Sequence, residues 1–445
     1  MRWTRECMDE SVTTSSGAIE RRVIRAITWR LIPFLMLLYL ISFLDRINVG
    51  FAALTMNNDV GLTSKMFGFG SGIFFAGYFL FEVPSTIILH RVGARFWIGR
   101  VMITWGIVSV AMAFTRGPLS FYVLRFLLGL AEAGFFPGII LYLSYWFPAQ
   151  HRSVVTAMFM AAAPVAGAIG SPISASLMQL HGFAGLRGWQ WLFILEGLPA
   201  VLLGFVTLLF LTNRPAEATW LDHQGRDWLT ETMAREQARV PSRQGALRGM
   251  LDWKVFALAL AYFGTSAGLY TIGFWAPLII KGLGFSIMQV GLLVAVPNVA
   301  AVFGMILWSR NSDRTGERYW HAAIACLVAA VGMGAVAGAP SSAAIAILGL
   351  SLTAFGVSAA KPPIWCLPTL FFGGTAAASS IGLINSLGTL GGFLGPYMIG
   401  AGQKGTHFSR GLYWVGGTLV VSAITLVMLR YVIWRGANAL ERKVL

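Results

Sequence analysis

Long apolar stretches recur along the whole chain, and short polar segments rich in Lys and Arg separate them. Each stretch approaches or exceeds the roughly 20 residues that a helix needs to cross the apolar part of a bilayer. The ends are approximate to a few residues, because the pattern marks only the membrane-embedded part of a helix. It predicts twelve membrane-spanning helices, at residues 31–53, 66–89, 96–115, 119–146, 153–180, 189–212, 255–280, 287–309, 320–338, 342–372, 376–402 and 411–434.

One longer polar segment interrupts this pattern and leaves six predicted spans on either side of it. Acidic and basic residues alternate within the segment, which is typical of a solvated, partly helical linker. We therefore expect an N-terminal tail, a six-helix bundle, a cytoplasmic linker, a second six-helix bundle and a C-terminal tail. Their boundaries are 1–30, 31–212, 213–254, 255–434 and 435–445.

The composition supports an all-α membrane protein, since 56% of the residues are hydrophobic and only 11% are charged. The net charge of +15 could indicate a nucleic-acid partner, but the positions of the basic residues predict none. Most of the 33 Lys and Arg residues are expected on the same side of the membrane as the two termini. This bias predicts an inner-membrane protein with both termini in the cytoplasm. Three lie within spans (Arg46, Arg125, Lys361), and six are expected outside (Lys65, Arg116, Arg187, Lys281, Lys404, Arg410).

The two halves of the chain resemble each other. Residues 90–97 (HRVGARFW) match residues 313–320 (DRTGERYW) at an offset of 223 residues, and the same offset pairs Gly68 with Gly291. Such duplication is typical of transporters that bind their substrate between two bundles near the middle of the membrane.

Four charged residues interrupt the first and fourth predicted spans: Asp45, Arg46, Arg125 and Glu132. A charge at mid-bilayer depth costs a few kcal/mol unless it is paired or faces water. Arg125 and Glu132 are seven residues apart, so they share one helix face at about 10 Å along the axis. We expect that face to point into the bundle.

These charges suit the binding of an anion coupled to protons. A guanidinium can hold a carboxylate through two parallel hydrogen bonds, which makes Arg46 and Arg125 candidates for substrate binding. Asp45 and Glu132 can gain and lose protons. While ionised they occupy an arginine, and protonation frees it for an organic anion, so proton and substrate cross together. The alternative is a buried structural cluster of the four side chains.

Four further residues within spans are candidates for substrate binding. The phenol of Tyr78 can donate to a substrate oxygen, Asn385 is a costly amide for packing alone, and Trp365 can close over a ligand. Lys361 would give a second cationic anchor from the opposite half and favour a substrate with two carboxylates. Alternatively, the side chain of Lys361 extends away from the cavity to the membrane surface. For Glu82 we expect a gate or packing contact.

Several of these segments are similar to motifs of a known family. The two matching loops resemble the loop motif of the major facilitator superfamily, although His90 stands where that motif usually has Asp. Within it, the chain resembles the anion:cation symporter family, and most closely its tartrate, phthalate and hydroxyphenylacetate permeases. The resemblance implies the major facilitator fold and proton sites at Asp45 and Glu132. It is carried by residues 44–48 (LDRIN), 129–138 (GLAEAGFFPG), 145–148 (YWFP), 191–197 (WLFILEG) and 382–386 (GLINS).

We therefore expect a monomeric importer of a small organic anion by proton symport, with a hydroxy-dicarboxylate such as tartrate as the first choice. Aromatic acids, sugar acids and anion exchange are the alternatives. No catalytic or phosphate-binding motif is present, so we expect no enzyme activity and no catalytic residues. The cysteines have no metal-ligand spacing, and we expect neither a cofactor nor a metal. The expected partners are the carboxylate, protons and the lipid bilayer.

Overall fold

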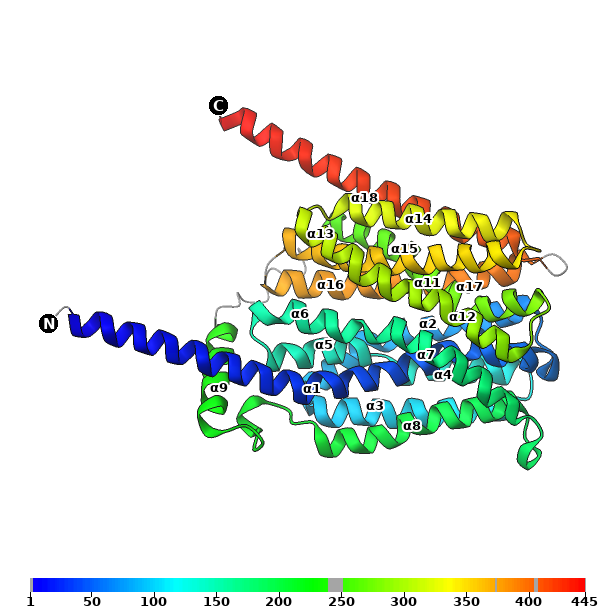
Figure 1. The fold of residues 1–445 in the computed structure, drawn as a ribbon, viewed down its shortest axis with the longest axis horizontal. Helices are drawn as coiled ribbons and strands as arrows, with labels where there is room; N and C mark the ends of the chain where they lie inside the picture. Colours follow the sequence, from blue (N-terminus) through cyan, green and yellow to red (C-terminus); the bar gives the residue numbers. More distant parts are fainter. Residues whose placement is uncertain (1–2, 239–250, 373, 404–406, 445) are drawn as a thin grey trace.

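The computed structural model describes residues 3–238, 251–372, 374–403 and 407–444, and these form helices joined by short loops. Figure 1 shows the long helices lying side by side, with both termini at the same end of the bundle. We call this end the terminal end and the opposite one the far end. Eleven helical stretches of the described residues are long and apolar enough to cross a membrane.

The first half supplies six of these stretches. Two of them contain a break, between α4 and α5 and between α6 and α7, yet each pair forms one crossing. The helices are α1 (Trp3–Val60), α2 (Ser64–Val92), α3 (Ala94–Ala111), α4 (Pro118–Glu132), α5 (Phe135–Trp146), α6 (Ala149–Met160), α7 (Ala162–Leu177) and α8 (Gly188–Phe210).

The second half supplies the other five stretches. Its fifth predicted span is not among them, because that crossing is divided into two shorter helices. The predicted span 376–402 consists of α16 and α17, which Leu390 separates, and neither helix alone is long enough to span. The helices are α11 (Trp253–Gly282), α12 (Ile287–Phe303), a π-helical turn η6 (Gly304–Trp308), α13 (Ser309–Thr315), α14 (Tyr319–Gly338), α15 (Ala343–Phe371), α16 (Gly374–Thr389), α17 (Gly391–Gly402) and α18 (Ser409–Val444).

The segment between the halves is partly helical, as the alternating charges predicted. It contains α9 (His223–Ala238), while residues 239–250 lie outside the described residues. The segment contacts the first half through two ion pairs, Arg22 with Asp222 and Arg152 with Glu236, each at 2.6 Å. The exact boundaries of the five regions stay predictions. The first helix begins well before residue 31, because hydropathy marks the membrane rather than the end of a helix.

The predicted internal repeat has a structural counterpart where the halves meet at the far end. A Cβ atom on Gly68 of α2 would lie 2.6 Å from the carbonyl oxygen of Pro396 on α17. A Cβ atom on Gly291 of α12 would lie 2.9 Å from the carbonyl oxygen of Ser171 on α7. Only glycine allows both backbone approaches. The second crossing therefore packs on the eleventh, and the eighth packs on the fifth. These two contacts are equivalent when the halves are related by a two-fold repeat.

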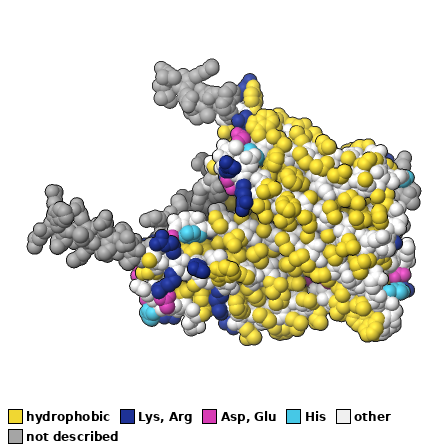
Figure 2. All heavy atoms as spheres, in the orientation of Figure 1, with side chains coloured by type: hydrophobic (Ala, Val, Ile, Leu, Met, Phe, Trp, Pro, Cys, Tyr) yellow, Lys and Arg dark blue, Asp and Glu magenta, His cyan; other side chains and the backbone are white. Residues whose placement is uncertain are grey.

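The surface is that of a multi-pass membrane protein. Figure 2 shows hydrophobic side chains over the body of the visible face, while Lys and Arg gather near the terminal end. Many large apolar side chains of the described residues are exposed, among them Leu209, Leu119 and Val331. A surface of apolar side chains suits contact with lipid, because the lipid core offers no hydrogen bonds to polar groups.

Candidate functional site

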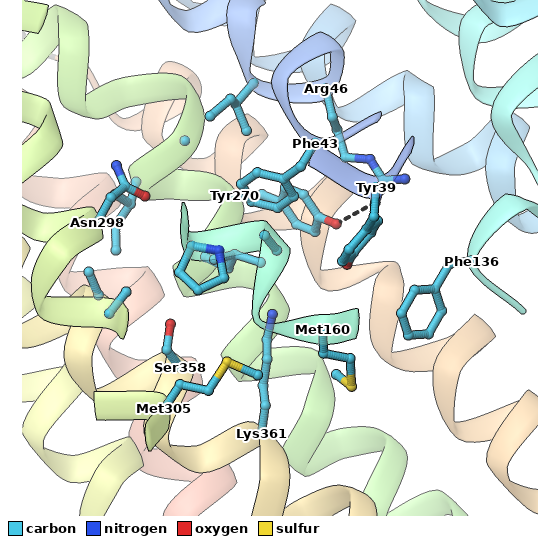
Figure 3. Close-up of a pocket in the computed structure, with 18 of the residues that line it drawn as sticks. Tyr39, Phe43, Arg46, Phe136, Met160, Tyr270, Asn298, Met305, Ser358 and Lys361 are labelled. Carbon is cyan, nitrogen blue, oxygen red and sulfur yellow. Dashed lines mark hydrogen bonds between the residues drawn. The ribbon is translucent and has the colours of Figure 1, made fainter. Parts of the chain in front are cut away.

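A cavity lies between the two halves and is lined by both. Four of the predicted substrate residues line it: Arg46 and Tyr78 from the first half, and Lys361 and Asn385 from the second. Figure 3 shows several of its residues as sticks. Further polar residues that line it are Tyr39, Ser171, Tyr262, Tyr270, Asn298, Ser358 and Thr389.

Arg46 is the charged centre of the first half, and both of its terminal nitrogens are engaged. Its Nη2 donates to Oε1 of Glu132 in a buried ion pair, and Ser42 Oγ donates to the same oxygen at 2.7 Å. Its Nη1 donates to the phenol of Tyr270 on α11 at 2.8 Å. The guanidinium also lies over the ring of Tyr78, 5.3 Å from its centroid. Arg46 therefore links the acid of its own half to the other half.

Glu132 lies at a break in its membrane crossing. It is the last residue of α4, and Gly134 after it has φ +84°, a left-handed conformation that favours glycine. A Cβ atom on Gly134 would also collide with Ser85 of α2. Irregular backbone at membrane depth is tolerated where it is buried or lines a cavity, and it often marks the binding site of a transporter.

Asp45 has different surroundings from Glu132, although both are buried. Trp105 Nε1 donates to Asp45 Oδ2 at 2.8 Å, and Ser109 Oγ donates to Oδ1 at 2.8 Å. These two donors are neutral and come from α3, and the amide of Asn48 on α1 also donates to Oδ1, at 3.4 Å. Asp45 is not among the residues that line the cavity, and no arginine of the described residues pairs with it. The two predicted proton sites are thus separate in kind: one acid is paired with a cation and one is not.

Arg125 is fully buried and poorly satisfied. Its Nη2 donates to the carbonyl of Ser71 at 3.3 Å, while Nε and Nη1 have no hydrogen-bond partner among the described residues. The guanidinium lies over the rings of Phe74 and Phe274, 5.0 and 5.7 Å from their centroids. Phe274 belongs to α11, so a ring of the second half packs against Arg125, which is not among the residues that line the cavity. A buried guanidinium with free donors is unusual, which keeps Arg125 a functional candidate.

Lys361 extends into the cavity and not toward the membrane surface. In Figure 3 its amine points from α15 into the space below Arg46 and Tyr270. Ser358, one helical turn earlier on α15, lines the same cavity. The cavity therefore has a cation on each side, one from each half of the chain.

The remaining candidates lie at or behind the cavity wall. Asn385 lines the cavity, and its amide nitrogen donates to the carboxylate of Glu82 on α2. Trp365 is not among the lining residues. Its ring packs edge-on against Tyr262, with centroids 4.9 Å apart, and Tyr262 does line the cavity. Trp365 therefore supports the wall in this state.

The chain is similar to known proteins in both sequence and fold. Residues 35–396 match the family model of the Major Facilitator Superfamily. The chain belongs to the Major Facilitator Superfamily. Two relatives from Agrobacterium vitis, each named "Putative tartrate transporter", are 60% identical over 415 residues and 58% identical over 425 residues. The first alignment covers 93% of this chain and 96% of the relative, and the second covers 95% and 94%.

Solved structures agree on the architecture. The inward open conformation of the xylose transporter XylE from E. coli matches this major facilitator protein with a TM-score of 0.73, over 90% of this chain and 95% of that one. The sequence identity is 15%, so this likeness shows the fold alone. Together the comparisons confirm the predicted superfamily, the two-bundle fold with twelve membrane-spanning helices, and the prediction that the chain is a transport protein and not an enzyme.

The sequence prediction found Tyr78 but missed three other tyrosines of this transporter's cavity, Tyr39, Tyr262 and Tyr270. Tyr39 is seven residues before Arg46 and therefore lies on the same helix face, a spacing that could have revealed it. Tyr270 directly follows Leu269, the residue that the repeat offset of 223 pairs with Arg46. Asn298 and Ser358 carry no such signal. Among the described residues, no three His, Cys, Asp or Glu side chains gather to hold a metal.

Proposed function

We propose that this major facilitator protein imports a small organic anion with two carboxylates, a hydroxy-dicarboxylate such as tartrate, together with protons. The observation that carries the proposal is that Arg46 and Lys361 line one cavity from opposite halves. Each cation can hold one carboxylate through charge-assisted hydrogen bonds. The names of the two Agrobacterium relatives support the substrate class. The motifs at 44–48 and 129–138 support membership of the anion:cation symporter family.

The coupling step follows from the contact between Arg46 and Glu132. While Glu132 is ionised, Arg46 Nη2 is bound to it and is lost to the substrate. A proton from the outer solution neutralises Glu132, and the freed Nη2 then binds a substrate carboxylate. After the cavity opens to the inside, loss of that proton restores the ion pair and expels the anion. Asp45 is the second proton site in this scheme, and Arg125 becomes available when Phe274 moves away.

The membrane orientation follows from the basic residues. Lys and Arg gather near the terminal end, which supports an inner-membrane protein with both termini in the cytoplasm (Figure 2). In this orientation the close contacts at Gly68 and Gly291 lie on the outer side. We propose that a monomer is sufficient for transport, since each chain has a cavity of its own.

Ligand-induced thermal stabilisation of the purified protein tests the substrate class. A ligand that binds the folded state raises the melting temperature by mass action. We expect the largest shift with tartrate-like diacids, no shift for Arg46→Ala and a reduced shift for Lys361→Met. A shift with phthalate, hydroxyphenylacetate or a sugar acid, and none with any aliphatic diacid, would overturn the dicarboxylate assignment.

Uptake into proteoliposomes tests the coupling. We expect labelled tartrate to accumulate when the outside is more acidic than the inside, and to equilibrate without accumulation when a protonophore is added. Counterflow that is as fast without a pH gradient, together with no accumulation when one is applied, would identify an anion exchanger.

A further inference from the structure

Glu82 is a buried carboxylate that the coupling scheme leaves unused. It lies on α2, one helical turn after Tyr78 of the cavity wall, and is only 4% exposed. Both of its oxygens accept hydrogen bonds from adjacent residues of α16. Ser386 Oγ donates to Oε2 at 2.7 Å, and Asn385 Nδ2 donates to Oε1. The contact joins the halves, since α2 belongs to the first and α16 to the second.

This contact fixes the direction of one amide. The Asn385 side chain has a donor end and an acceptor end, whereas an ionised carboxylate only accepts hydrogen bonds. Glu82 therefore holds the nitrogen end of Asn385 toward itself. Because Asn385 also lines the cavity, its oxygen end is the one left for a ligand. Ser386 holds the second oxygen of Glu82 and so keeps the carboxylate from rotating.

We infer that Glu82 is a positioning residue, which holds the amide oxygen of Asn385 toward the cavity so that it accepts a hydrogen bond from a hydroxyl group of the substrate. A carboxylate offers acceptors alone, and an amide oxygen repels it. A hydroxyl group donates, and the same oxygen binds it. The direction of Asn385 thus selects hydroxylated anions over their deoxy analogues. This inference rests on the proposed function and deepens it, because the two cations hold the carboxylates and Asn385 distinguishes what lies between them.

The reverse orientation would have the opposite selectivity. With its nitrogen toward the cavity, Asn385 would donate to a carboxylate and would favour any dicarboxylate, hydroxylated or not. Glutamine at position 82 has a donor and an acceptor and so permits both orientations. Glu82→Gln therefore changes the selectivity while it preserves the size of the side chain and removes only a charge that no substrate contacts.

The test measures affinity for a matched pair of ligands, tartrate and succinate, by titration calorimetry of the purified protein. Wild type is expected to prefer tartrate. In Glu82→Gln we expect this preference to fall by up to about tenfold, the range of one hydrogen bond, while the affinity for succinate stays the same or rises. A purely structural role for Glu82 would weaken both ligands equally and leave their ratio unchanged, and that result would overturn the inference.

Two further variants separate the positioning role from general damage. Ser386→Ala keeps the bond between Asn385 and Glu82, so the preference for tartrate should remain. Asn385→Ala should lower the preference, and Glu82→Gln in that background should lower it no further, because both changes remove one interaction. If Asn385→Ala retains the full preference, the inference is wrong, even where Glu82→Gln does not fold.

The dicarboxylate assignment can be wrong while the inference about Glu82 and Asn385 still holds. If wild type binds neither diacid, the dicarboxylate assignment is wrong. The ratio is then measured for the anion of the thermal panel that does bind, paired with its deoxy analogue. Equal affinity of wild type for that pair would overturn the role of Asn385 and Glu82, and a preference that Glu82→Gln abolishes would support it.

Discussion

The two halves contribute different chemistry to the same cavity. The first half brings Arg46, which is already paired with Glu132, a residue outside the cavity lining. The second half brings Tyr270, Asn385 and the amine of Lys361, of which only Lys361 is charged. Under the proposed function, the first half therefore supplies proton coupling and one carboxylate anchor, and the second half supplies the contacts that select among ligands. Each of the following predictions tests that division.

Replacing Arg46 should have the largest effect. Arg46→Ala removes the carboxylate anchor and leaves Glu132 buried without its cation, so we expect uptake to fall by about 100-fold or more. Arg46→Lys keeps the charge but loses the planar fork, and should recover only part of the activity. Initial rates in proteoliposomes measure both, with normalisation to the amount of folded protein. Near-normal transport in Arg46→Ala would remove the first half from substrate binding.

Replacing Glu132 should separate binding from coupling. Glu132→Gln imitates the protonated acid, so substrate should bind without a proton. In wild type we expect affinity for the anion to rise as the pH falls, and in Glu132→Gln we expect it to be independent of pH. Counterflow should continue in the variant while accumulation driven by a pH gradient is lost. Asp45→Asn is the comparison, and retention of gradient-driven accumulation there would exclude Asp45 as a proton site.

Replacing Lys361 tests whether the second half binds the second carboxylate of the substrate. Lys361→Met keeps the length of the side chain and removes its charge. We expect the dissociation constant of a dicarboxylate to rise by about tenfold or more, the value of one charge-assisted hydrogen bond. A monocarboxylate should be affected far less, since Arg46 alone holds it. Equal losses for the two ligand classes would show that Lys361 acts on the cavity as a whole.

Tyr270→Phe should have the smallest effect. It removes the 2.8 Å hydrogen bond to Arg46 Nη1 and keeps the ring, so a loss of about 1 kcal/mol, roughly fivefold in affinity, is expected. The pH dependence should not change, because Glu132 is untouched. A shift of the pH profile in calorimetry would place part of the coupling in the second half.

The sequence predicted the membrane spans well because each is an independent run of apolar residues. It also indicated which charges matter, since a charge in an apolar span has few uses. It could not predict how the charges pair. Arg46, Asp45 and Glu132 suit several pairings, and helix packing decides that Glu132 meets Arg46 while Asp45 meets Trp105 and Ser109.

Other features were beyond the sequence because they depend on both halves at once. The packing of Phe274 against Arg125 requires α4 and α11 to meet, and the direction of Lys361 requires the cavity itself. The division of the eleventh crossing at Leu390 was also missed, since both segments are apolar and form one continuous run in the sequence.

That division has a mechanical consequence. α17 packs on α2 at the far end through the backbone contact at Gly68, whereas α16 carries Asn385 toward the terminal end. We propose that Leu390 acts as a joint at which α16 tilts while α17 stays docked. We therefore expect the bound anion to lose its contact with Asn385 before the outer seal loosens, so that escape to the inside proceeds in two kinetic phases. Spin labels on α16 and on α17 would then report two different relaxation times within one membrane crossing.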